Sequence, residues 1–278
     1  MTSTKTFLIT GVSSGLGRAF AIGALDAGHT VIGTVRNDEA AAAHEALAPD
    51  RAHALTLDVT DFDGVTKAVQ DAERRFGSID VLVNNAGYGH EGVLEEASLD
   101  DIRRQFNANV FGPVAVIKAV LPGMRERRTG RIINVTSMGG FITMPGITSY
   151  CGSKFALEGI SEALGKELKP FGIYVTALAP GQFRTDWAGR SMDRTPRRLS
   201  DYDDVMDPIR AARQAKSGMQ PGDPAKAAQA VLTLVASDAP PTRLYLGEDA
   251  LGLVAQKLES MRAEMAIWEA LSRSTNFA

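Results

Sequence analysis

The chain has 278 residues, 44% of them hydrophobic, which is enough for a sizeable core in one large α/β domain or two small ones. Its 30 Lys and Arg residues nearly balance 33 Asp and Glu residues, and a formal charge of -3 argues against a broad cationic surface for nucleic acid. The single cysteine, Cys151, excludes an internal disulfide framework, and the four histidines lack zinc-like spacing. We therefore expect no metal site and a reducing, cytoplasmic setting.

No segment of the chain is expected to act as an export signal or a membrane span. The first apolar run, FLIT, is too short and wrongly flanked for a signal peptide. The best later candidate, residues 110–124, is interrupted by Pro113, Lys118 and Pro122 and falls short of the roughly 20 apolar residues that a bilayer needs. We expect a soluble protein without a membrane partner.

Short apolar runs alternate with longer helical patterns along the chain. Nearly continuous apolar strands separated by helices predict a parallel sheet covered on both faces, and right-handed crossovers then give a doubly wound α/β fold. Strands are expected at residues 6–10, 30–36, 53–59, 79–87, 131–137 and 173–180, with a seventh at 243–246. Helices are expected at 16–28, 39–47 and 63–77, within 99–126, and from Tyr150 to about Pro170.

One domain accounts for this alternation, because no repeat, low-complexity tract or interdomain linker interrupts it. Residues 182–223 form the one long irregular stretch, with charge blocks of opposite sign at 194–198 and 200–204. Such a stretch is either a solvated loop or a lid over a ligand, since loops of this length are usually functional or disordered.

Three glycines, Gly11, Gly15 and Gly17, lie between the first strand and the first helix. Glycines let a backbone approach a phosphate closely, and the following helix N-terminus offers free N–H groups and a favourable dipole to a pyrophosphate. The spacing here is G-x-x-x-G-x-G rather than the G-x-G-x-x-G of the common dinucleotide fingerprint. Taken alone, these glycines could also serve only to form a tight turn without binding a phosphate.

The residues after the second strand bear on the choice of dinucleotide. Folds that prefer NAD usually present an acid to the ribose there, whereas this chain presents Arg36, whose guanidinium can bind the 2′-phosphate of NADP. The alternative is a solvated Arg36 with Asp38 or Glu39 at the ribose. Asp58, after the third strand, either hydrogen-bonds the adenine amino group or caps the next helix.

Several motifs occur together in one order. They are TGVSSGLG at 10–17, NNAG at 84–87, Asn109, Ser137, YCGSK at 150–154 and PGQFRT at 180–185. In order and separation they resemble the short-chain dehydrogenase/reductase family, in its ordinary rather than extended branch, and more loosely the hydroxysteroid and retinol dehydrogenases. The resemblance spans about residues 5–247. It implies a single Rossmann domain at 1–247, with a lid at about 182–223, and a C-terminal helical extension of that domain at 248–278.

The resemblance also implies an NAD(P)-dependent oxidoreductase with four catalytic residues. Tyr150 would be the general acid in reduction and the general base in oxidation, and Ser137 would hydrogen-bond the substrate oxygen. A phenol with an unperturbed pKa of about 10 exchanges its proton poorly near neutral pH unless its phenolate is stabilised. Lys154, one helical turn away, would lower the pKa of Tyr150 and would also bind the nicotinamide ribose. Ser149 is the expected helix cap. Asn109 would hold a water that links Lys154 to solvent, or is a buried amide or a helix irregularity.

The cofactor site implied by the family includes the glycine turn and three later segments. Asn84 would brace adjacent strands, and Thr185 would bond the nicotinamide carboxamide. The expected cofactor-binding residues are Gly11, Ser13, Ser14, Gly15, Leu16, Gly17, Arg36, Asp58, Val59, Asn85, Ala86, Gly87, Tyr150, Lys154, Pro180, Gly181 and Thr185. NADP(H) is the expected cofactor, with NAD(H) possible.

The residues expected around the reacting centre are apolar and adaptable, which favours a bulky hydrophobic ketone or aldehyde and its alcohol. If Arg36 selects NADP, reduction is the expected direction. The wall is expected to contain Met138, Phe141, Met144, Gln182, Phe183 and Trp187, with Met192, Tyr202 and Met206 from the lid. Cys151 is expected to pack rather than react, and His90, just after NNAG, is the histidine nearest to the motifs.

Beyond the common fold, Leu251, Val254, Leu258, Met261, Met265 and Trp268 alternate at spacings of three and four residues. This seam predicts a helix that covers the chain's own sheet or lid, or else a subunit contact. The family resemblance implies a homodimer or homotetramer that pairs through the helices around 99–126 and 150–169. The rival class is a nucleotide-sensing regulatory protein that keeps the fold without turnover, although Tyr150 and Lys154 are both present.

Overall fold

Seven parallel strands form the central sheet of the computed structural model, which describes residues 4–216 and 218–277. The spatial order is β3-β2-β1-β4-β6-β7-β9, and every neighbouring pair is parallel. The predicted seven-stranded, doubly wound α/β fold is confirmed. The strands are β1 (Thr6–Ile9), β2 (Thr30–Val35), β3 (Ala52–Thr56), β4 (Val81–Asn84), β6 (Gly130–Val135), β7 (Ile173–Pro180) and β9 (Arg243–Leu246).

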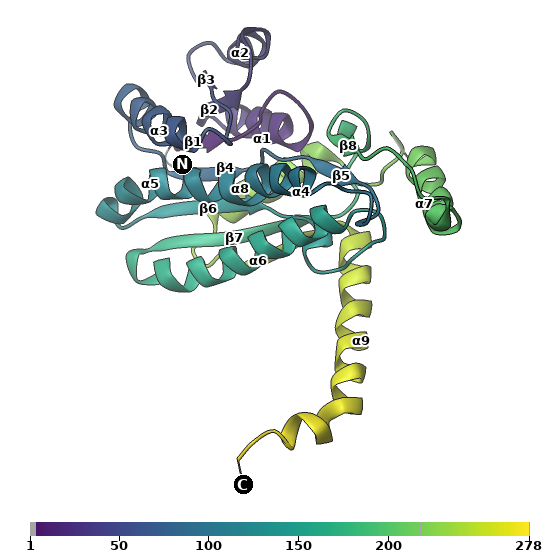
Figure 1. Ribbon diagram of the computed structural model, residues 1–278. Coiled ribbons are helices and arrows are strands. Elements are labelled where there is room, and N and C mark those ends of the chain that lie inside the picture. The colour runs from purple at the N-terminus through teal and green to yellow at the C-terminus, as the bar shows by residue number, and fades with distance from the viewer. Residues whose placement is uncertain (1–3, 217, 278) are drawn as a thin grey trace.

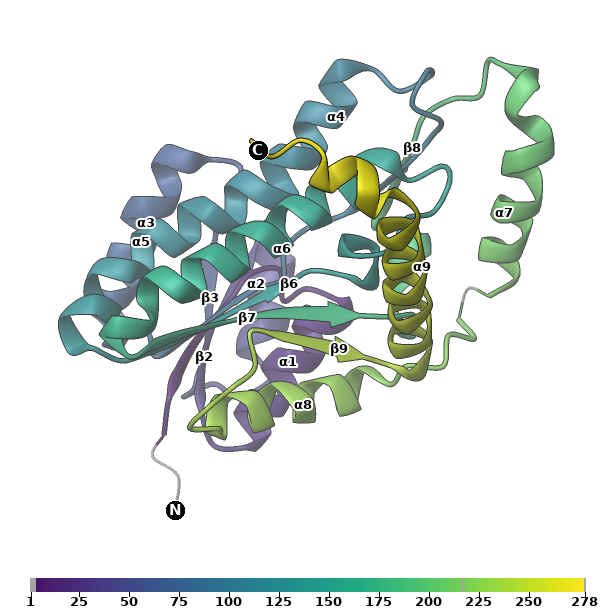
Figure 2. The same cartoon turned by 90° about the horizontal axis from the view of Figure 1, so that it is seen from below.

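Helices cover both faces of this sheet, as Figures 1 and 2 show. Along β1, Phe7 and Ile9 pack with α1 and α8 on one face, whereas Leu8 between them packs with α3 and α5 on the other. The five interior strands therefore bury both of their faces, which explains the continuous apolar runs, whereas the edge strands β3 and β9 are only partly buried. The helices are α1 (Gly15–Asp26), α2 (Asp38–Glu45), α3 (Phe62–Phe76), α4 (Leu99–Phe106), α5 (Gly112–Arg127), α6 (Thr148–Leu168) and α8 (Pro224–Ala236).

The order of the strands reverses at β1, which lies between β2 and β4. Crossovers from β1 therefore leave in opposite directions, and a crevice opens at the carboxyl ends of the strands. The segment after β4 continues along this edge into a short strand, β5 (Gly89–Glu91), which lies outside the main sheet.

The stretch at 182–223 was expected to be irregular, and the structure shows that it is largely ordered. It contains 3₁₀ turns at Asp186–Ala188 and Ser200–Tyr202, the strand β8 (Met192–Arg194) and the helix α7 (Asp203–Ala215). Strand β8 pairs in parallel with β5, which follows the NNAG motif. The charge blocks that suggested a loop are partly explained by ion pairs from Arg197 to Asp203 and Asp207.

The C-terminal helix α9 (Glu248–Arg273) starts at the edge of the domain and projects away from it (Figure 1). Only Ala250 and Val254 of this helix are buried, against Met138 and Ile142. The prediction that the seam covers the chain's own sheet or lid is therefore wrong beyond the first two turns. Among the described residues, helices with the length and apolarity needed to cross a bilayer are absent.

Candidate active site

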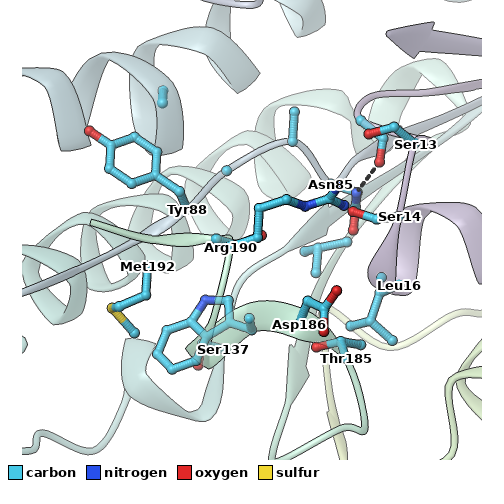
Figure 3. A pocket seen from close by; sticks show the side chains of 18 of the residues that line it. Ser13, Ser14, Leu16, Asn85, Tyr88, Ser137, Thr185, Asp186, Arg190 and Met192 are labelled. Carbon is cyan, nitrogen blue, oxygen red and sulfur yellow. Dashed lines mark hydrogen bonds between the residues drawn. The ribbon is translucent and has the colours of Figure 1, made fainter. Parts of the chain in front are cut away.

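A cleft of about 1140 Å³ lies at the carboxyl ends of the strands, between the glycine turn and the segment 182–223. Figure 3 shows side chains from these two sides facing each other, with Ser13 and Ser14 opposite Tyr88 and Met192. The cleft extends from Asp58 at one end to Tyr150 at the other. This is the place that the doubly wound topology assigns to a ligand.

The glycine turn forms one wall of the cleft and leads into α1. Gly11 and Gly15 have φ angles of 72° and 58°, a conformation that favours glycine. Ser14 is the N-cap residue of α1, but its side chain makes no capping hydrogen bond, and the first turn carries no acid. The first N–H groups of the helix therefore lack a side-chain cap and suit an anionic ligand.

Gly17 lies outside the lining of the cleft, and its contact with the cofactor stays a prediction. A Cβ at this position would lie 2.1 Å from the Gly11 carbonyl oxygen and 2.3 Å from Asn85 Nδ2. Asn85 donates from Nδ2 to the carbonyl oxygens of Thr10 and Gly11, at 3.0 and 3.1 Å. Gly17 and Asn85 thus hold the shape of the turn, and Asn85 also lines the cleft.

The far end of the cleft contains Arg36, Glu39, Asp58 and Val59, whereas Asp38 does not line it. Asp61, rather than Asp58, is the N-cap of α3. Asp58 Oδ1 accepts hydrogen bonds from Thr60 N and Oγ1 at 2.8 and 2.7 Å. Burial raises the pKa of Asp58, but these hydrogen bonds and the charge of Arg36 outweigh it and leave the pKa below its ordinary value. Asp58 is therefore ionised at neutral pH, and its negative charge is balanced in part by Arg36.

The near end brings Ser137, Tyr150 and Lys154 together. Ser137 follows β6, and the other two lie one turn apart at the start of α6. Lys154 Nζ donates to the Val135 carbonyl oxygen at 2.9 Å and lies 5.8 Å from the centre of the Tyr150 ring. Ser137 hydrogen-bonds the Tyr150 side chain. Thr185 lies across the cleft, where a Cβ on Gly15 would be 3.8 Å from Thr185 Cβ.

This geometry agrees with comparisons to known proteins. A sequence model described as short chain dehydrogenase matches residues 5–195, well over half of the chain. The chain belongs to the short-chain dehydrogenase/reductase family. Oxidoreductase BOA17 of Botryotinia fuckeliana is 39% identical over 270 residues, covering 97% of this chain and 98% of that protein. A 3-ketodihydrosphingosine reductase of Bacteroides thetaiotaomicron is 38% identical over 245 residues, covering 87% and 88%.

Solved structures give the same assignment for this dehydrogenase/reductase. A crystal structure of a short-chain dehydrogenase from Streptomyces avermitilis has a TM-score of 0.93 and 43% identity, covering 99% of this chain and all of that one. The similarity in fold therefore extends through α9. ElxO with NADP bound has a TM-score of 0.76 and 26% identity, covering 90% of this chain.

Burial acts on the two titratable residues at the near end of the dehydrogenase's cleft, Tyr150 and Lys154. It raises the pKa of Tyr150 to about 12, against a lowering influence of the Ser137 hydrogen bond. Burial also lowers the pKa of Lys154 to about 8, opposed by the charge of Glu158. The Lys154 ammonium, 5.8 Å from the centre of the Tyr150 ring, is placed where a positive charge also favours the phenolate.

The buried ammonium of Lys154 predicts a particular dependence of stability on pH. A lysine whose pKa falls from 10.5 to about 8 on folding destabilises the fold below pH 8, and the penalty disappears as the pH approaches 10.5. At 1.36 kcal/mol per unit, the free energy of unfolding of the wild type should rise by about 3 kcal/mol relative to Lys154→Met across this window. Urea unfolding of both proteins at several pH values measures it. A difference that is independent of pH would contradict the buried charge.

Asn109 lies in a π-helical turn, Asn107–Phe111, between α4 and α5, which confirms the predicted helix irregularity. It accepts from Tyr88 N at 3.1 Å and donates to Tyr88 O at 3.0 Å and Ser153 Oγ at 3.1 Å. It is buried behind the lining of the cleft rather than in it. Its visible action is to fix the backbone of Tyr88, and the expected water relay stays a prediction.

Two further polar residues have structural contacts. Asn84 donates from Nδ2 to Asn134 Oδ1 at 2.9 Å and so braces β4 against β6, as the resemblance implied. Ser149 is not the cap of α6, because the helix already begins at Thr148 with Ile147 at the N-cap position. Instead, Ser149 Oγ lies 3.0 Å from His90 Nδ1.

The substrate end of the cleft differs in part from the predicted wall. Met138, Met144, Gln182, Phe183, Trp187 and Met192 line it, whereas Phe141, Tyr202 and Met206 do not. Phe141 packs edge-to-face on Tyr245, and Tyr202 bonds to Glu95 at 2.6 Å. Trp187 packs on the Tyr150 ring, with centroids 5.2 Å apart. The contact of Trp187 with Tyr150 joins residues 37 positions apart, so it becomes visible only in the folded chain.

Charged and aromatic lining residues were missed from the sequence. Tyr88 follows NNAG directly, and its place next to the motif was an available signal. Arg190 and Arg213 come from the segment 182–223, where no motif marks them. In Figure 3, Arg190 extends over the cleft between Tyr88 and the glycine turn. The mouth of the cleft is thus more polar than the predicted wall.

A buried carboxylate holds α7 to the rest of the domain. Glu91 is 2% exposed and pairs with Arg213 and with Arg210, whose Nε lies 3.0 Å from Glu91 Oε1. His90 joins the same regions, since its Nε2 lies 2.9 Å from Thr195 Oγ1 and its Nδ1 contacts Ser149. The segment 182–223 therefore rests on polar contacts with β5.

Replacement of Glu91 by Gln should lower the free energy of unfolding by roughly 3–5 kcal/mol, because Arg210, Arg213 and, at 3.8 Å, Arg194 lose their buried counterion. Glu162→Gln is the matched control. Glu162 is half-exposed and pairs with Lys166 at 2.8 Å and with Arg243 at 3.7 Å, so its replacement should cost at most about 1 kcal/mol. Urea unfolding of the three proteins compares them. Equal losses of unfolding free energy in the two variants would show that the Glu91 cluster does not hold the segment 182–223.

Proposed function

We propose that this dehydrogenase/reductase uses NADPH in preference to NADH and reduces a bulky hydrophobic ketone or aldehyde to its alcohol. The observation that carries the proposal is the convergence of Tyr150, Ser137 and Lys154 at one end of a cleft whose other end holds Arg36. The apolar wall of Met138, Met144, Ile147, Trp187 and Met192 supports the substrate class.

The residues of the cleft fit a dinucleotide with an extra phosphate. The uncapped start of α1 suits a pyrophosphate, and the exposed Arg36 side chain is available for a 2′-phosphate. Asp58 uses Oδ1 for Thr60, which leaves Oδ2 as an acceptor for an adenine amino group. Glu39 also lines this end, and it is the residue through which NADH would compete.

The chain's own groups supply the proton and the orientation. When bound, the reduced dinucleotide supplies the hydride. Ser137 orients the substrate oxygen by a hydrogen bond, and Tyr150 donates its proton to that oxygen. Because its pKa is about 12, Tyr150 remains protonated at neutral pH and is ready to donate. Proton transfer leaves Tyr150 as a phenolate, and the Lys154 ammonium, 5.8 Å from the ring centre, stabilises that negative charge. Trp187 packs on the phenol ring and shields it from solvent.

A substrate screen that follows oxidation of NADPH and NADH in parallel tests the proposal. Hydrophobic ketones and aldehydes should be turned over efficiently with NADPH, and small charged carbonyl compounds poorly. The reverse order of substrates would contradict the proposed class. Binding of NADPH without its consumption across the panel would favour a regulatory protein instead.

A further inference from the structure

The C-terminal helix has almost no contact with the rest of its own chain. α9 has 26 residues, which at 1.5 Å per residue gives a length of about 39 Å. From Ala255 to Phe277 no residue is buried. Figure 1 shows the helix leaving the domain at its first turns and ending far from the sheet. In proteins most helical stability comes from packing of an apolar face rather than from intrinsic propensity, so we expect another surface to pack against α9.

An apolar stripe runs along this helix. Val254, which packs on the domain, is followed by Leu258, Met261, Met265 and Trp268 at alternating steps of four and three residues. Side chains with this spacing lie on one side of a helix. The four that follow Val254 are 43%, 40%, 72% and 56% exposed. A continuous exposed stripe of this kind marks an interaction site.

We propose that α9 is a dimerisation helix, which pairs in antiparallel orientation with α9 of a second copy of this chain. The stripe is self-complementary about a point between Glu259 and Ser260. With the two-fold axis there, Leu258 of each copy meets Met261 of the other, and Trp268 reaches the exposed Leu251 at the base of the opposite helix. A spacing of three and four residues is the pattern of knobs-into-holes packing.

Charges beside the stripe obey the same two-fold relation. Lys257 of each copy faces Glu264 of the other, which gives two opposite-charge pairs across the interface. The remaining acid near the tip, Glu269, is already paired with Arg273 of its own helix at 2.6 Å. Both features favour the helix of a second copy as the occupant.

The charge of the helix argues against a membrane as the occupant. α9 carries five acids and three basic residues. Helices that lie on anionic lipid surfaces have Lys and Arg on the polar face. A second protein chain fits the helix better than a lipid surface does.

Light scattering after size exclusion tests the proposal on the full-length protein. Leu258→Glu/Met261→Glu places four acids at the centre of the interface and should halve the mass of the wild-type assembly. The control, Gln256→Glu/Ala263→Glu, adds the same charge on the opposite side of α9 and should keep the wild-type mass. Both should retain NADPH turnover, which shows that they fold. A monomeric wild type, or an unchanged mass in the first variant, would overturn the proposal.

A charge-swap pair tests the antiparallel register itself. Lys257→Glu and Glu264→Lys each turn two attractive contacts into repulsive ones, and each should weaken self-association about tenfold at low salt. Mixed in equal amounts, the two variants should form a heterodimer in which both pairs are again opposite in charge. Sedimentation velocity measures all three samples. No gain in association on mixing would rule out the proposed register.

Discussion

Tyr150→Phe should reduce kcat for ketone reduction by a factor on the order of 10² to 10⁴, with the affinity for NADPH almost unchanged. The substitution removes the proton donor and leaves the ring that packs against Trp187 at 5.2 Å. Since Ser137 and Lys154 stay in place, the substrate oxygen is still oriented but receives no proton from the protein. Stopped-flow turnover and fluorescence titration of NADPH separate the two effects.

The matched control is Tyr174→Phe, which removes a phenol that packs under Arg131, outside the lining of the cleft. It should retain wild-type kcat. If Tyr150→Phe keeps most of its turnover, another group donates the proton, and the role assigned to Tyr150 is wrong. If NADPH affinity falls as steeply as kcat, the residue acts through binding instead.

Arg36→Asp should weaken NADPH binding by about 10- to 100-fold and change NADH binding far less. A hydrogen bond to a charged group contributes about 1.5–3 kcal/mol, and every 1.4 kcal/mol is a factor of ten in affinity. The new carboxylate would also repel a 2′-phosphate, while it could accept hydrogen bonds from the ribose of NADH. Calorimetric titration with each cofactor gives the two affinities.

Arg103→Asp makes the same change of charge outside the cleft, at an exposed residue that pairs with Asp100, and so controls for long-range electrostatics. It should leave the ratio of the two affinities unchanged. Equal losses of NADPH and NADH binding in Arg36→Asp would mean that the phosphate contact is misplaced. In that case Glu39, which lines the same end of the cleft, becomes the candidate contact to the ribose of NADH.

The fold was predictable from the sequence because the five interior strands of the sheet are buried on both faces. Alternation of apolar runs with helices follows directly from that burial. The order within 182–223 was not predictable in this way. Helix α7 is held by the pairing of its arginines with Glu91, a residue more than a hundred positions earlier in the chain. No local pattern records such a contact.

The site shows the same division. Motifs placed Tyr150, Lys154 and Ser137 together, and the structure brings them into one cleft. Their spacing suggested that Lys154 lowers the Tyr150 pKa, which stays a prediction, whereas the burial that raises this pKa is visible only in the fold. Asn109 was recognised as a motif residue, yet its bonds to the backbone of Tyr88 arise from a π-helical turn that sequence periodicity does not reveal.

The helix α9 shows why an apolar seam alone does not identify what covers it. The spacing of Val254 and the apolar residues that follow it predicts a packed helix, whether the neighbour is the same chain or another. The folded structure adds that Val254 is the last residue of α9 to be buried against the chain's own domain.

The most direct test of the catalytic account traces the hydrogen that reaches the product. NADPH carrying deuterium at both positions of the reduced ring carbon is supplied with a hydrophobic ketone, and the alcohol is analysed by mass spectrometry. The account predicts one deuterium on the carbinol carbon with the wild type and almost no alcohol with Tyr150→Phe. Alcohol without deuterium, or equal yields from the two proteins, would contradict it.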